Sequence, residues 1–140
     1  MNKSIKITFW LVVGLFIFMM SEIFMPDLLM QKEVFLSSIL LFAIVSTVLA
    51  WLTWKSDIKG KLRLFLLLSG TCGTGFMISV VLHNLLYAMS ILTEDIFLLK
   101  YFFEALHVFF FLVGVFVCPT GLLIGIGGAI WEVFRGSDKK

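Results

Sequence analysis

Three ionisable side chains stand in otherwise apolar stretches, and their types and spacing are those that could do chemistry. His83 lies in one long hydrophobic segment, and Glu104 and His107 lie in the next. Two imidazoles and a carboxylate are a plausible ligand set for a divalent metal such as zinc, with a fourth position left open. Glu104 and His107 also have the i, i+3 spacing of helical di-metal sites, but those sites repeat the pair on a second helix and this chain has one copy.

Two other interpretations of the same residues stay open. The cluster could handle protons or ions, because a histidine exchanges protons near neutral pH. It could also be structural, since a hydrogen bond between His83 and Glu104 would satisfy two polar groups in lipid and fix the register of two helices, at about 0.5–2 kcal/mol. We favour the structural interpretation, because it alone accounts for the residues.

No other motif points to an enzyme or to a bound cofactor. The two cysteines, Cys72 and Cys118, lie in apolar runs and form no CxxC pair, so zinc knuckles and disulfide chemistry have no support. The glycine-rich run 69–75 lacks the lysine-containing pattern of a phosphate-binding loop and lies within a hydrophobic segment. We therefore expect a protein that is not an enzyme and carries no resident cofactor, with a divalent metal as the one open alternative.

The composition identifies the kind of element that must position these side chains. Of 140 residues, 61% are hydrophobic and 14% are charged. Soluble domains carry roughly 45–50% apolar and about 25% charged residues, and a water-soluble fold of this size could not bury so much apolar surface. A bilayer removes the problem because lipid replaces the missing protein core. The net charge of +2 is too small to indicate nucleic-acid binding.

Four segments meet the requirement of about 20 mostly apolar residues for crossing roughly 30 Å of hydrocarbon. They cover approximately residues 5–24, 34–54, 64–92 and 96–134. Breaks at Pro26 and Asp27, between residues 55 and 63, and at residues 93–95 separate them. Helices are expected because backbone groups in lipid must be paired within the segment. The sequence predicts an all-α polytopic membrane protein, a four-transmembrane-helix bundle, with residues 1–140 in one membrane domain.

Lysine and arginine positions predict the orientation of these helices. Cytoplasmic loops carry an excess of basic residues. Of eleven basic residues, only Lys32 and Lys100 fall in the first and third connections, and the others fall in the two tails and the second connection. Both termini are therefore expected in the cytoplasm, in a multi-pass protein of the cell membrane. The first segment ends in bulky residues where a signal-peptide cleavage site would stand, so we interpret it as a retained helix.

The fourth segment is longer than one span. As a single straight helix, residues 96–134 would extend about 58 Å at 1.5 Å per residue. We expect its start, residues 96–103, to lie in the outer interface or to protrude beyond it. Pro119 should add a bend, because it frees a backbone carbonyl one turn earlier.

Small and polar residues recur along the fourth segment at alternating spacings of four and three, which keeps them on one helical face. The third segment carries a matching stripe that includes Cys72 and His83. Folding the two segments back about Glu94 predicts that His83 faces Glu104 and that Ser79 lies near His107. In membranes, small residues mark helix contacts because they let backbones approach closely. The predicted helix-packing residues are Gly73, Gly75, Ser79, Gly114, Gly121, Gly125 and Gly128.

The helices carry more small residues on their surfaces than the packing of one helical hairpin requires. This excess favours assembly with other chains. The leading hypothesis is a non-catalytic accessory or assembly subunit, or a homo-oligomer, whose partners are the lipid bilayer, further copies of itself or other membrane subunits. The alternative is a small transporter or an ion- or metal-binding membrane protein centred on His83, Glu104 and His107.

Overall fold

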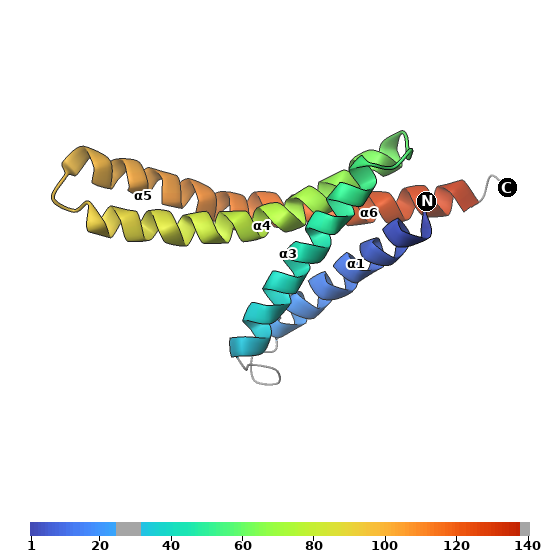
Figure 1. The fold of residues 1–140 in the computed structure, drawn as a ribbon, viewed down its shortest axis with the longest axis horizontal. Coiled ribbons are helices and arrows are strands. Elements are labelled where there is room, and N and C mark those ends of the chain that lie inside the picture. The colour runs from blue at the N-terminus through green and yellow to red at the C-terminus, as the bar shows by residue number, and fades with distance from the viewer. Residues whose placement is uncertain (25–31, 138–140) are drawn as a thin grey trace.

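The computed structural model describes residues 1–24 and 32–137, and within these ranges the chain is helical, with no strand. The predicted break at Pro26 and Asp27 lies outside the described residues. The elements in chain order are α1 (Lys3–Phe24), α3 (Lys32–Trp54), α4 (Lys61–Leu92), α5 (Phe97–Leu112), the π-helix η1 (Val113–Val117) and α6 (Cys118–Ser137) (Figure 1). The all-α prediction is confirmed.

Four helical stretches are long and apolar enough to cross a membrane. They are Lys3–Ser21, Leu36–Trp54, Lys61–Leu92 and Phe97–Arg135, and the last runs through α5, η1 and α6. Runs of Leu, Ile, Val and Phe form these helices because the intrahelical ladder pairs their backbone groups. The four hydrophobic segments expected from the sequence therefore correspond to four helical stretches in the structure.

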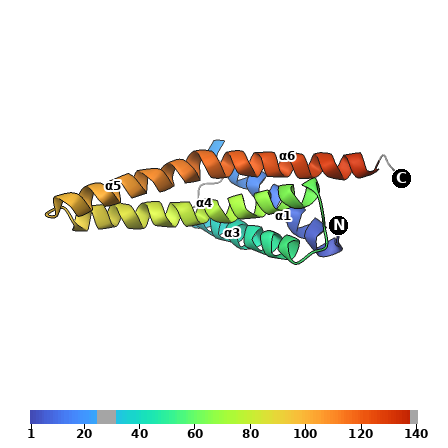
Figure 2. The ribbon, with the colours of Figure 1, turned by 90° about the horizontal axis from the view of Figure 1, so that it is seen from above.

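The helices form two antiparallel pairs that cross each other (Figure 1). Helix α4 runs beside α5, η1 and α6 along its whole length, and α1 runs beside α3. The α1–α3 pair packs against the half of α4 that faces α6, and then diverges, so that the other half of the long hairpin projects alone (Figures 1 and 2). We call this projecting part, residues 80–112, the α4–α5 arm.

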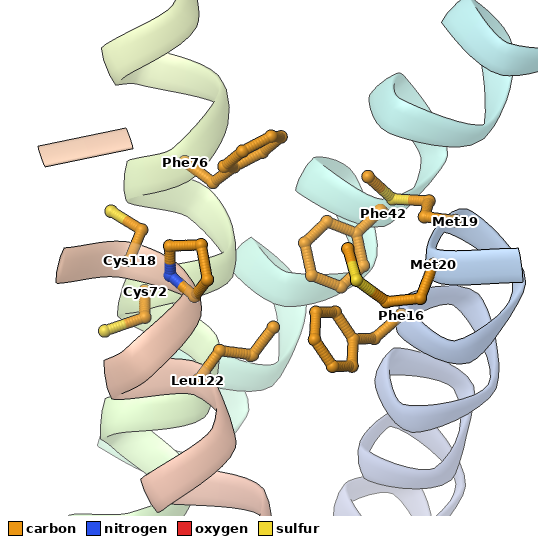
Figure 3. A pocket seen from close by; sticks show the side chains of 9 residues that line it. Phe16, Met19, Met20, Phe42, Cys72, Phe76, Cys118 and Leu122 are labelled. Atoms are coloured by element: carbon orange, nitrogen blue, oxygen red, sulfur yellow. The ribbon is translucent and has the colours of Figure 1, made fainter. Parts of the chain in front are cut away.

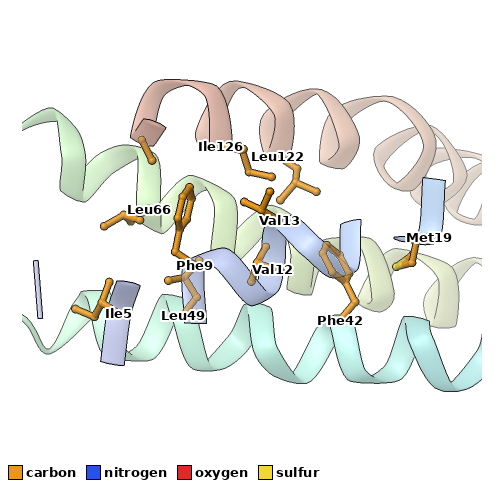
Figure 4. Close-up of a cluster of buried hydrophobic side chains, with 11 residues drawn as sticks. Ile5, Phe9, Val12, Val13, Met19, Phe42, Leu49, Leu66, Leu122 and Ile126 are labelled. Atoms are coloured by element: carbon orange, nitrogen blue, oxygen red, sulfur yellow. The ribbon is translucent and has the colours of Figure 1, made fainter. Parts of the chain in front are cut away.

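The apolar core lies where the two pairs cross (Figure 4). Phe9 and Val12 of α1 are almost fully buried there, together with Leu49 of α3 and Leu66 of α4. Leu122 of α6 closes the cluster from the other side. By contrast, α5 has no buried residue. The structure therefore has one packed end, at the crossing, and one end where only two helices are in contact.

Close backbone approach at glycines holds the packed end together. A Cβ at Gly70 would lie 2.7 Å from the backbone nitrogen of Ala50 on α3. A Cβ at Gly125 would lie 2.5 Å from Ser69 Oγ and 2.7 Å from the Ser69 backbone nitrogen on α4. These separations are shorter than any ordinary carbon contact, so only glycine allows the helices to come this close. Thr47 and Thr74 add a hydroxyl hydrogen bond of 3.0 Å between α3 and α4.

Two short connections set the direction of the long hairpin. Before α4, Gly60 adopts a φ of +74°, a left-handed conformation that favours glycine. Between α4 and α5, the Ile96 amide donates to the Thr93 carbonyl at 2.9 Å, which closes a tight turn. Across that turn, Lys100 Nζ lies 3.5 Å from Glu94 Oε1. The chain therefore reverses within four residues.

A π-helical turn joins α5 to α6 directly before Pro119. The backbone amide of Cys118 bonds to the carbonyl of Val113, five residues earlier, in place of the usual four. Proline lacks an amide hydrogen and cannot bond to the carbonyl one turn before it. The structure accommodates this loss with a wider turn, a device that occurs often near functional sites. The sequence indicated a local distortion at Pro119, but not its form.

Candidate functional site

The site on the α4–α5 arm is built around His83 and His107. His83 Nδ1 lies 3.0 Å from the backbone carbonyl oxygen of His107, which links the side chain of α4 to the backbone of α5. The two imidazole ring centroids are 5.1 Å apart, with 40° between the ring planes. Both histidines are half-buried. One hydrogen bond and one ring contact thus join the two helices at the same level of the arm.

The hydrogen bond fixes the tautomer of neutral His83. A carbonyl oxygen can only accept, so Nδ1 of His83 must carry the proton and donate it. Nε2 of His83 then keeps its lone pair and can accept a proton or bind a metal ion. On the other ring, His107 Nδ1 is buried and has no hydrogen-bond partner among the described residues. Each ring therefore retains at least one nitrogen that has no hydrogen-bond partner among the described residues.

Aromatic side chains surround the two imidazoles. The Tyr87 ring centroid lies 5.5 Å from that of His107, and the Phe111 ring centroid lies 5.4 Å from that of His83. Next to His83, a recess of about 210 Å³ opens between α4 and the junction of α5 with η1, and Ser79 and Gly114 form part of its wall. The setting is mostly apolar, with polar atoms supplied by the histidines, by Ser79 and by the hydroxyl of Tyr87.

Glu104 does not complete this pair. In the structure, Ser79 faces Gly114, and His83 contacts His107 and Phe111. The predicted register, with His83 opposite Glu104 and Ser79 beside His107, is therefore wrong by about two helical turns, since Ser79 faces Gly114, seven residues beyond His107. The position of the turn in the sequence does not determine how far one helix is displaced along the other, and in the structure the positions that face α4 lie further along α5 and η1 than a fold-back about Glu94 places them. In the part of the chain that the structure describes, no three His, Cys, Asp or Glu side chains gather closely enough to hold a metal ion.

The residues predicted to pack helices divide between two interfaces. Gly121, Gly125 and Gly128 of α6 face Cys72, Ser69 and Phe65 of α4. Gly75 approaches the sulfur of Cys118, and Gly114 approaches Ser79, each within 3.3 Å of an added Cβ. Gly73 instead faces Ser46 and Phe42 of α3.

A second recess lies where the two helix pairs begin to diverge (Figure 3). Its free volume is about 30 Å³, and Met19 and Met20 of α1 and Phe42 of α3 face Phe76 of α4 and Leu122 of α6 across it. Cys72, Cys118 and Pro119 complete the wall beside the π-helix. Every lining side chain is apolar or a thiol, so the recess offers no acid, base or charged anchor.

Sequence reasoning missed Tyr87 and Phe111 as neighbours of the histidines. A signal was present, because each follows a histidine by four residues and therefore lies on the same helical face. The glycine-rich run 69–75 indicates helix packing at Gly70, but no local pattern reveals that its partner is Ala50 on α3. Comparison with protein-family models, with curated proteins and with solved structures finds no match to this chain. Function is therefore inferred from the geometry of the site.

Proposed function

We propose that this protein is an integral membrane protein that assembles through its α4–α5 arm, most simply with a second copy of itself. The observation that carries the proposal is the length of helix α4, whose outer end lies in the arm, together with the apolar surface of the arm up to its tip. Helix α4 has 32 residues, which extend about 48 Å. The hydrocarbon layer is about 30 Å thick, and a tilt of up to about 40° lengthens the path through it only to roughly 39 Å.

The tip of the arm therefore extends beyond the hydrocarbon layer. Its apolar side chains must be shielded from water there by something other than lipid tails. Its side chains are strongly apolar and open, with Leu92 78% exposed, Phe97 74% and Leu98 79%. Exposed apolar surface of this kind marks contact with a membrane or with a partner protein. The α1–α3 pair diverges from the arm and does not supply the cover (Figure 1).

The polar residues of the arm support a protein partner over lipid alone. His83, Glu104 and His107 are each only partly buried by the single chain. Ionisable side chains at bilayer depth usually face other protein or a water-filled cavity, because exposure to lipid costs free energy. A second copy is the occupant we propose, since closed homo-oligomers are the commonest assemblies and use the same surface on both subunits.

The orientation proposed is cytoplasmic for both termini. Basic residues favour it, and the start of α1 and the end of α6 lie toward the same end of the molecule as the α3–α4 connection (Figures 1 and 2). The arm would then point to the outer side of the membrane. Its α4–α5 turn, with Glu94 and Asp95, would lie at or beyond the outer interface.

Native mass spectrometry of gently extracted protein tests the assembly. The wild type should appear as a multiple of the chain mass. The double variant Phe102→Ala/Phe109→Ala, on the exposed face of α5, should shift the population toward single chains. A matched control is Leu40→Ala/Ile44→Ala, on equally exposed positions of α3, which should leave the mass unchanged. A wild type that is strictly monomeric and brings no partner would contradict the proposal, and a complex with another membrane subunit would replace the second copy by that subunit.

A further inference from the structure

We infer that His83 and His107 together chelate a transition-metal dication, for which Zn²⁺ is the best fit. The ligand atoms are Nε2 of His83, which the hydrogen bond from Nδ1 leaves free, and Nδ1 of His107, which is buried without a hydrogen-bond partner among the described residues. This inference concerns one chain and does not depend on assembly.

The first step concerns the orientation and tautomer of His83, which the fold already sets as a metal ligand requires. Metal-binding histidines usually donate their second ring nitrogen to a carboxylate or a backbone carbonyl, which orients the ring and makes the ligating nitrogen more basic. His83 Nδ1 makes this bond to the His107 carbonyl at 3.0 Å. The bond presents Nε2 in the tautomer that a metal requires, before any metal arrives.

The second step is the separation of the two rings. Zinc bonds to imidazole nitrogen are about 2.0 Å long in tetrahedral sites, which places the centroids of two rings on one ion about 5 Å apart. The observed separation is 5.1 Å. The two helices therefore hold the rings at the distance of a chelate.

The third step is the unsatisfied nitrogen of His107. Its Nδ1 is buried and has no partner within the described residues. Buried polar atoms are nearly always satisfied, and an ion is one of the explanations for an exception. Lone pairs of neutral imidazole suit zinc, copper and nickel better than magnesium or calcium, which prefer oxygen ligands.

The fourth step is the identity of the remaining ligands. Since no third His, Cys, Asp or Glu joins the pair in the described chain, water or a small donor would fill the other positions. The recess beside His83 gives such a molecule room. Two protein ligands with open positions describe an exchangeable metal and not a closed structural site.

Equilibrium dialysis of the full-length protein against Zn²⁺ tests this inference. The chain has only two histidines, so purification must use a tag without histidine. The wild type should bind one zinc ion per chain at neutral pH. His83→Asn keeps a donor for the His107 carbonyl but removes Nε2, and His107→Phe keeps the ring contacts but removes the nitrogens. Each should weaken binding by at least about tenfold, whereas Glu104→Gln and Cys72→Ala/Cys118→Ala should bind as the wild type does.

Copper gives a readout that needs no variant. Electron paramagnetic resonance of wild-type protein loaded with Cu²⁺ should show couplings from two imidazole nitrogens. Absence of these couplings, or wild-type zinc affinity in His83→Asn and His107→Phe, would overturn the inference. Because stoichiometry is counted per chain, a monomer that binds zinc would refute the proposed assembly and leave the metal site standing.

Discussion

At the scale of residues, His83 shows how one side chain can link two helices without a charged partner. Its Nδ1 donates to a backbone carbonyl, so the acceptor is supplied by the fold of α5 and not by a side chain. The sequence predicted that His83 and His107 would lie on facing helices, and the structure brings them together. It could not predict the acceptor, because every helical residue has a carbonyl and only the register selects one.

Replacement of His83 should separate its structural role from its chemistry. His83→Ala removes both the interhelical hydrogen bond and the ring contact with His107, and should lower the free energy of unfolding by about 0.5–2 kcal/mol. His83→Asn restores a donor and should recover a large part of that loss. Thermal unfolding in mild detergent, followed by circular dichroism, measures both changes. Equal unfolding temperatures for wild type and His83→Ala would show that the bond contributes nothing.

At the scale of elements, the glycines of α6 show where the helices cannot tolerate a side chain. The heptad-like spacing predicted one continuous face on this helix. Gly121, Gly125 and Gly128 do face α4, whereas Gly127 has open space around the position of a Cβ. Gly127 lies outside that spacing, and although its place in the glycine-rich run suggested helix packing as well, the structure leaves it open.

A pair of alanine substitutions tests this distinction. Gly125→Ala would place a methyl group against the backbone of Ser69 and the carbonyl of Phe65, atoms that cannot rotate away. The expected cost is about 1–3 kcal/mol of unfolding free energy, typical of overpacking. Gly127→Ala meets no atom within 4 Å and should be neutral or slightly stabilising, since alanine favours the helix. Unfolding temperatures in the same detergent compare the two, and a Gly127→Ala variant as unstable as Gly125→Ala would contradict the packing described.

The sequence predicted a distortion near Pro119, but it did not predict that the distortion would be a π-helical turn. Proline before a long apolar run indicates lost hydrogen bonding but leaves several outcomes, including a kink and a wider turn. The choice between them depends on contacts that Cys118 and Gly114 make with α4. The lengths of the helices were predicted more easily, because the start and end of each hydrophobic run coincide with charged or turn-forming residues.

At the scale of the whole molecule, composition predicted four long helices but not their arrangement. A compact bundle was the natural expectation for four antiparallel segments. The structure instead crosses two pairs at one end and leaves the arm projecting (Figure 1). The crossing depends on which glycines of α4 face α3 and on which residues of α4 face α6. The sequence of α4 alone does not show how its residues divide between these two neighbouring helices.

Accessibility of single cysteines tests the proposed orientation. In a Cys72→Ala/Cys118→Ala background, Asp57→Cys lies in the exposed α3–α4 connection and Asp95→Cys lies in the exposed turn of the arm. A membrane-impermeant maleimide applied to intact cells should modify Asp95→Cys and spare Asp57→Cys until the cells are permeabilised. The reverse pattern would invert the topology, and modification of both in intact cells would argue against a membrane-spanning chain.

Disulfide cross-linking in native membranes tests most directly whether the α4–α5 arm meets a second copy inside the bilayer. In the same cysteine-free background, Phe102→Cys places a thiol on the exposed face of the arm, and Leu40→Cys places one on the equally exposed face of α3. With a mild oxidant such as copper phenanthroline, Phe102→Cys should form a covalent dimer and Leu40→Cys should remain a single chain. If Phe102→Cys forms no dimer, or Leu40→Cys cross-links as readily, the arm is not the assembly surface.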